Sequence, residues 1–165
     1  MPAQKFDVVI IGAGIAGSAL AVALAGQGLS LALVEAQSLE RKPLPDDTSL
    51  KTFDARVSAL TPNSVRFLEQ LGAWSHIAGY RHCPYGHMTV WDAEGTGRIE
   101  FDCAELKAPA LGYIVENRAI VDGLLLAMDQ AHGIQRYNPD RLQSCQRCED
   151  GSMELLLDSG KTIEA

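Results

Sequence analysis

The chain has 165 residues, of which 47% are hydrophobic and 21% are charged, a balance typical of one soluble domain with a real core. Its formal net charge is −7, and its longest basic run is the dipeptide Arg41-Lys42. This charge pattern excludes nucleic acid as a partner and provides no basic patch for an anionic membrane surface.

The first predicted element is a strand, a tight turn and a helix. The stretch DVVIIGAGIAG opens with a β-branched run over residues 6–11 and then places Gly12, Gly14 and Gly17 in the spacing G-x-G-x-x-G. Gly12 permits the sharp turn, Gly14 lets a pyrophosphate approach the backbone, and Gly17 lets the helix pack closely on the sheet. The first-turn amides of that helix have no intrahelical acceptors and therefore suit an anion.

The length of this apolar stretch raises two other interpretations. Residues 8–26 contain a single polar side chain, Ser18, and approach the length of a membrane span or of a signal peptide. The four glycines, the acid at Asp7 and the lack of a basic start disfavour both interpretations.

A second strand is predicted over residues 29–34, and it ends at Glu35, which follows Gly12 by 23 residues. In a βαβ unit, a carboxylate at this place accepts hydrogen bonds from a ribose. The sequence therefore predicts a dinucleotide site formed by these residues: Gly12, Gly14, Ile15, Ala16, Gly17, Glu35 and Ala36.

Two further helices are predicted from their caps. Thr61, followed by Pro62, caps a helix that Gly72 ends, so we expect Arg56 in the loop entering that helix. Asn117 caps a helix that runs to about residue 131, with Arg118 in its first turn.

Strands are predicted between and after these helices. Residues 86–92 and 98–101 form a hairpin, and residues 142–148, 153–157 and 161–165 form a meander that packs against the nucleotide-binding sheet.

No metal site or protein-based catalytic group is predicted, and we name no catalytic residue. Cys145 and Cys148 have the spacing of a zinc ligand pair, but no second pair follows, and residues three apart on a strand point to opposite faces. The four histidines are dispersed, and we expect four reduced thiols in a cytoplasmic protein.

Three stretches carry a resemblance to a known family. The segment DVVIIGAGIAGSALAVALAGQGLSLALVEA resembles the amino terminus of the class A flavoprotein monooxygenases, which are FAD-dependent aromatic hydroxylases. The more selective stretches DARVSAL (54–60) and LGYIVENR (111–118) are similar to the ubiquinone-biosynthesis hydroxylases, which act on polyprenylated phenols. The resemblance spans essentially the whole chain and corresponds to the N-terminal portion of those enzymes.

The resemblance implies an α/β architecture, namely a Rossmann-like FAD/NAD(P)-binding fold with inserted β-strands. Residues 1–165 would form an incomplete FAD-binding domain, and residues 80–115 would begin a substrate-facing β region. Arg56 would lie beside the flavin, and Arg118 would face a phosphate or the ribose of FAD, with a surface salt bridge to Glu116 as the alternative.

The resemblance further implies FAD as cofactor, NAD(P)H as co-substrate and a phenolic quinone precursor as substrate. The C-terminal part of the family fold would be missing, so we expect the isolated chain to be inactive without that portion or another biosynthetic enzyme as partner. A nicotinamide-dependent Rossmann reductase and a non-catalytic flavin-binding module are the alternatives. Cytoplasmic localisation is expected, and peripheral association with the inner membrane is left open.

Overall fold

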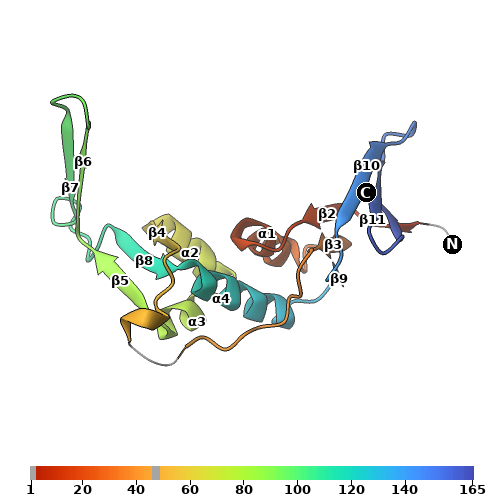
Figure 1. Cartoon of the computed structure of the whole chain (residues 1–165), viewed down its shortest axis with the longest axis horizontal. Coiled ribbons are helices and arrows are strands. Elements are labelled where there is room, and N and C mark those ends of the chain that lie inside the picture. The colour runs from red at the N-terminus through yellow and green to blue at the C-terminus, as the bar shows by residue number, and fades with distance from the viewer. Residues whose placement is uncertain (1–2, 46–48) are drawn as a thin grey trace. The chain divides into compact units, whose positions relative to one another are not determined.

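The structure is a computed structural model that describes residues 3–45 and 49–165 (Figure 1). Its described residues form two compact units. The first unit combines Met1–Pro43 with Val121–Ala165, and the second unit is the continuous segment Leu44–Ile120. The assignment of residues 1–165 to one incomplete FAD-binding domain, with a substrate-facing region beginning at residues 80–115, stays a prediction.

The first unit is built on a three-stranded parallel sheet in the order β2-β3-β9. Its elements are β1 (Gln4–Lys5), β2 (Val8–Ile11), α1 (Ile15–Leu24), β3 (Leu31–Val34), the later part of α4 (Asn117–Gln130), β9 (Ile134–Tyr137), β10 (Leu142–Arg147), β11 (Met153–Leu157) and β12 (Thr162–Glu164). The predicted strand, helix, strand order at the start of the chain is confirmed. The third parallel strand, β9, was not expected from the sequence.

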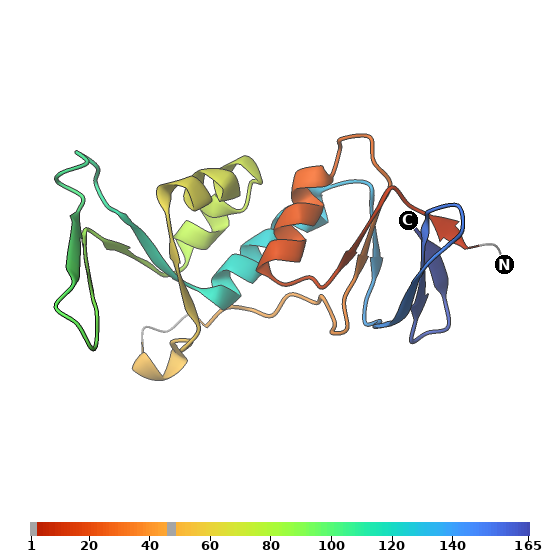
Figure 2. The same ribbon diagram turned by 90° about the horizontal axis from the view of Figure 1, so that it is seen from above.

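The two faces of this sheet carry different layers because side chains alternate along each strand. Ile10 and Leu33 face α1 and α4 and pack there with Ala21, Leu125 and Met128. In Figures 1 and 2, α1 lies on one side of the sheet and the strands β10–β12 lie on the other. The α/β character expected from the sequence is therefore present in this unit.

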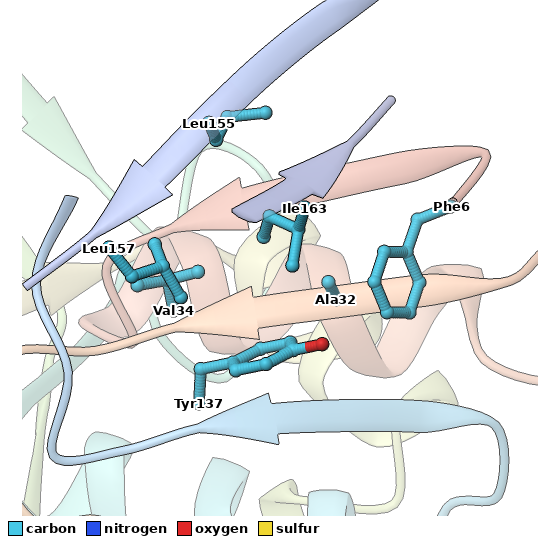
Figure 3. Close-up of a cluster of buried hydrophobic side chains, with 7 residues drawn as sticks. All are labelled: Phe6, Ala32, Val34, Tyr137, Leu155, Leu157 and Ile163. Carbon is cyan, nitrogen blue, oxygen red and sulfur yellow. The ribbon is translucent and has the colours of Figure 1, made fainter. Parts of the chain in front are cut away.

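The opposite face is covered by the predicted meander, as Figure 3 shows. The strands β10, β11 and β12 pair in antiparallel fashion, and β12 also pairs in parallel with β1. Phe6 and Tyr137 meet edge to face with ring centroids 6.2 Å apart. The cluster that joins the two layers consists of Phe6, Ala32, Val34, Tyr137, Leu155, Leu157 and Ile163. The expected packing of the meander against the sheet is confirmed.

The second unit contains a three-stranded antiparallel sheet in the order β4-β8-β5. Its elements are the 3₁₀ turn η1 (Leu50–Thr52), β4 (Val57–Leu60), α2 (Pro62–Gln70), α3 (Trp74–Gly79), β5 (His82–Tyr85), β6 (His87–Trp91), β7 (Arg98–Asp102), β8 (Gly112–Glu116) and the first turn of α4. On one face of the sheet the rings of Trp74, His82 and Tyr113 lie 5.4–6.0 Å apart.

Most of the helix and hairpin predictions in this unit are confirmed. The Thr61 side chain caps α2 by accepting from the amide of Ser64, and β6 and β7 form the expected hairpin. One expectation needs correction: Arg56 lies in a loop, but the strand β4 separates this loop from α2, because residues 57–60 pair with β8. Within residues 3–45 and 49–165, no helix has the length and apolar character needed to cross a membrane.

Candidate functional site

The glycine-rich corner between β2 and α1 has the close packing that the sequence predicts. Gly12 has a φ of +95°, a conformation that favours glycine, and its amide donates to the carbonyl of Val34 at 2.8 Å. A Cβ at Gly17 would lie 1.9 Å from the oxygen of Gly12, so only glycine fits where α1 crosses the turn. The buried hydroxyl of Ser18 donates to the carbonyl of Ala13 at 2.9 Å and fixes the corner further.

The amides at the start of α1 are available to a ligand. Gly14 is the N-cap residue, and no side chain caps the helix. Among the described residues, none accepts a hydrogen bond from the amides of Gly14, Ile15, Ala16 or Gly17. An added Cβ at Gly14 would meet no atom of the described residues within 4 Å, apart from its own chain neighbours, so the space beside Gly14 is open. Open space, free amides and the positive end of the helix dipole fit a diphosphate.

Glu35 lies at the same corner, as the βαβ spacing predicts. Its Oε2 accepts from the amide of Ala13 at 2.7 Å, and its Oε1 accepts from the amide of Gln37 at 2.8 Å. A carboxylate has about four acceptor sites, so both oxygens can accept further hydrogen bonds from hydroxyl groups. Ala36, the other residue predicted here, is exposed. The structure therefore brings the glycine turn and the acid together, as a dinucleotide site requires.

The two predicted cofactor arginines, Arg56 and Arg118, belong to the second unit, where they are neighbours despite 62 residues of separation. Val57 pairs with Glu116, and the amide of Asn117 donates to the carbonyl of Arg56 at 3.0 Å. The Arg56 side chain is exposed.

Arg118 makes the salt bridge to Glu116 that was the alternative to cofactor contact. Its Nε donates to Oε2 of Glu116 at 2.7 Å, and its Nη2 also donates to the carbonyl of Thr52. Lost hydration opposes the charge of Arg118, but the hydrogen bond and charge of Glu116 outweigh it and raise the arginine's pKa. About 30% of the Arg118 side chain is exposed.

Glu116 emerges as the centre of this cluster, a role that the sequence did not indicate. It is only 4% exposed, and its Oε1 lies 3.0 Å from Nη2 of Arg81. Its Oε2 also accepts from the amide of Asp54 at 3.0 Å. One buried carboxylate thus joins two cations to the loop that carries Arg56. The available signal was an acid that ends an apolar strand, which is the same pattern as Glu35 at the end of β3.

A pocket of about 510 Å³ opens beside this cluster. The guanidinium of Arg81 stacks over the rings of Phe53 and Tyr80, 4.1 and 4.6 Å from their centroids. The residues that line the pocket are mostly apolar, with one ion pair: Phe53, Val57, Tyr80, Arg81, His82, Cys83, Ile114 and Glu116. Such a lining suits a flat, largely apolar ring system with polar edges.

The cysteines take separate positions. Cys145 is exposed on β10, Cys148 follows the end of that strand, and all four cysteines are free thiols.

Comparison with known proteins establishes the family. Residues 5–164 match the family model described as FAD binding domain. The chain therefore belongs to the FAD-binding domain family, and FAD is the cofactor of that family.

Curated relatives and solved structures agree with this assignment. The chain is 34% identical over 165 residues to 3-demethoxyubiquinol 3-hydroxylase of Escherichia coli, covering all of this chain and 40% of that protein. It is 42% identical over 123 residues to ubiquinone biosynthesis monooxygenase COQ6, mitochondrial, of Xenopus tropicalis, covering 72% of this chain and 25% of that one. The crystal structure of Pseudomonas aeruginosa PqsL in complex with 2-aminobenzoylacetate shares the fold, with a TM-score of 0.70, 21% identity and coverage of 97% and 41%.

The chain thus spans 40% or less of the length of these two curated relatives. Neither alternative to flavin chemistry, a nicotinamide-dependent reductase or a non-catalytic module, is favoured by these relatives.

Proposed function

We propose that this chain is the nucleotide-binding portion of an FAD-dependent monooxygenase that hydroxylates a polyprenylated phenol in ubiquinone biosynthesis. The family match and the two ubiquinone-pathway relatives support the reaction class. When bound and reduced by NAD(P)H, FAD supplies the activated oxygen that is transferred to the aromatic ring.

The observation that carries this proposal is the corner formed by Gly12, Gly14 and Gly17 together with Glu35. The free amides of residues 14–17 would bind the diphosphate of FAD, and the Glu35 carboxylate would accept from the ribose hydroxyls. Ile15, Ala16 and Ala36 would contribute backbone contacts.

In the second unit, Arg56 would lie beside the flavin, and Arg118 would face a phosphate or the ribose of FAD. The ion pair with Glu116 holds Arg118 in one orientation, which lowers the entropy lost when it meets an anion. The protein's part in the reaction is to bind, orient and exclude water, and no side chain is assigned to the chemical step.

The visible absorption spectrum of the purified protein tests the cofactor. Bound oxidised flavin colours the protein yellow, whereas a nicotinamide-dependent reductase is colourless. We expect the 165-residue chain to bind added FAD weakly. The spectrum is therefore followed by a titration that records the change in FAD fluorescence on binding to the protein, with NADH as the competing ligand. Tight NADH binding without FAD binding would overturn the proposal.

Turnover separates catalysis by this chain alone from cofactor binding. We expect no product when the FAD-loaded chain is given NADPH and a polyprenylated phenol. NADPH oxidation coupled to hydroxylated product would show that this chain needs no further portion or partner enzyme.

The substrate's polyprenyl tail also predicts peripheral contact with a bilayer. Co-sedimentation with vesicles that contain the phenol, compared with vesicles that lack it, tests this contact. Absence of the protein from both vesicle pellets would contradict the predicted bilayer contact.

A further inference from the structure

The segment that follows Glu35 has no regular secondary structure, yet it is fixed in place. Residues 36–43 form neither helix nor strand. Holding an irregular segment costs about 1–2 kcal/mol of backbone entropy per residue, so specific contacts must offset this cost.

Two side chains of this segment provide such contacts. Leu39 is partly buried against the cluster that includes Ala21, Leu125 and Met128. Arg41 makes a bidentate ion pair with Asp122 of α4, with Nε to Oδ1 at 2.8 Å and Nη2 to Oδ2 at 2.9 Å. Asp122 is 7% exposed, and this pairing raises the pKa of Arg41.

The location of the segment gives this ion pair a functional meaning. Ligands of parallel α/β sheets bind beyond the carboxyl ends of the strands, and residues 36–43 leave the sheet at the carboxyl end of β3. The segment also orients Glu35 directly, because the amide of Gln37 donates to Oε1 of Glu35. Displacement of the segment would therefore move one of the two donors that orient this carboxylate.

We propose that the ion pair between Arg41 and Asp122 is a positioning device for the adenosine end of the dinucleotide. It holds residues 36–43 in one conformation beside Glu35, so that the ligand does not have to order this segment when it binds. This inference rests on the proposed function and adds two positioning residues, neither of which touches the flavin ring in this scheme.

The test compares two acidic residues of the same helix by calorimetric titration with ADP, which carries the adenosine and diphosphate of FAD. Asp122→Asn removes the buried pair, and Asp129→Asn removes an exposed pair with Arg136 whose Nη1–Oδ1 distance is 2.7 Å. If the segment without its anchor occupies the binding arrangement about a tenth of the time, ADP affinity falls about tenfold in Asp122→Asn. Asp129→Asn should bind ADP as the unmodified chain does.

Limited trypsin digestion provides a second readout on the same variants. The bond between Arg41 and Lys42 is a trypsin site that the ion pair should protect in the native chain. We expect rapid cleavage there in Asp122→Asn, slow cleavage in Asp129→Asn, and slower cleavage of the native chain when ADP is added. Should Asp122→Asn fail to fold, Arg41→Lys replaces it, because lysine keeps the charge and loses the bidentate geometry.

The outcomes are distinct. Failure of the unmodified chain to bind either ADP or FAD would overturn the proposed function and this inference with it. ADP binding that is equal in the native chain and in the folded variant lacking the pair would overturn the inference alone.

Discussion

Replacement of Gly17 by alanine tests the close approach of α1 to the preceding turn. The added Cβ would lie 1.9 Å from the oxygen and 3.0 Å from the carbon of Gly12, and contacts under 3.0 Å essentially never occur. The helix must therefore move by about 1 Å, and overpacking of this kind costs about 1–3 kcal/mol. For a chain of this size the melting temperature should fall by about 3–9 °C. Because the amides of α1 move with the helix, FAD affinity should fall about 10–100-fold.

Thermal unfolding followed by circular dichroism without FAD, and fluorescence titration with FAD, measure the two effects separately. Gly14→Ala is the matched control for stability, since its Cβ would meet no atom within 4 Å and its φ of −68° suits any residue. Its stability should change by less than about 1 kcal/mol, while its methyl group intrudes on the diphosphate and weakens FAD binding. A Gly17→Ala variant with native melting temperature and native FAD affinity would refute the packing argument. Native FAD affinity in Gly14→Ala would refute the placement of the diphosphate.

Three further predictions concern other positions. Gly112→Ala places a Cβ 2.3 Å from the oxygen of Leu60, so the β4-β8-β5 sheet should lose about 1–3 kcal/mol, measured by urea unfolding. Glu116→Gln removes the negative charge shared by Arg81 and Arg118 and should lower the free energy of unfolding by about 3 kcal/mol. Replacement of the exposed Glu100 by Gln should change it by less than about 0.5 kcal/mol. Equal urea midpoints for the two variants would contradict the role of Glu116. The Ser159 hydroxyl and then backbone amides lower the pKa of Asp140, so its stabilisation is present above about pH 4 and is lost as pH falls through the depressed pKa. The difference in urea midpoint between the native chain and Asp140→Asn should therefore be present at neutral pH and vanish in acid.

The local elements of the fold could be predicted because their signals lie within a few residues. The strand and helix around Gly12 and Gly17, the Thr61 cap and the hairpin of β6 and β7 each carry their own turn or cap chemistry. By contrast, β9 has only four residues, and its identity as a strand depends on pairing with β3, about a hundred residues away in sequence.

The site shows the same division. Glu35 was predicted because spacing within one βαβ unit defines its place. Glu116 was weighed only as a surface partner of Arg118, because its burial depends on Arg81 and on the loop around Asp54. The contact between Arg41 and Asp122 joins residues 81 positions apart, and no local sequence pattern predicts it. Charged residues brought together by tertiary structure are therefore the part that sequence patterns miss.

The discontinuity of the first unit bears on how this chain is made. During synthesis the second unit, Leu44–Ile120, emerges as one continuous segment. The elements β2, α1 and β3 emerge earlier, but they cannot complete their packing until β9 and the meander that covers their other face have been synthesised. Pairing of β1 with β12, which aligns Gln4 with Ile163, can form only after residues 162–164 have been synthesised. The nascent nucleotide-binding strands thus remain open to chaperones and proteases until these later strands have been made. A protease pulse on stalled chains of increasing length would reveal when protection begins.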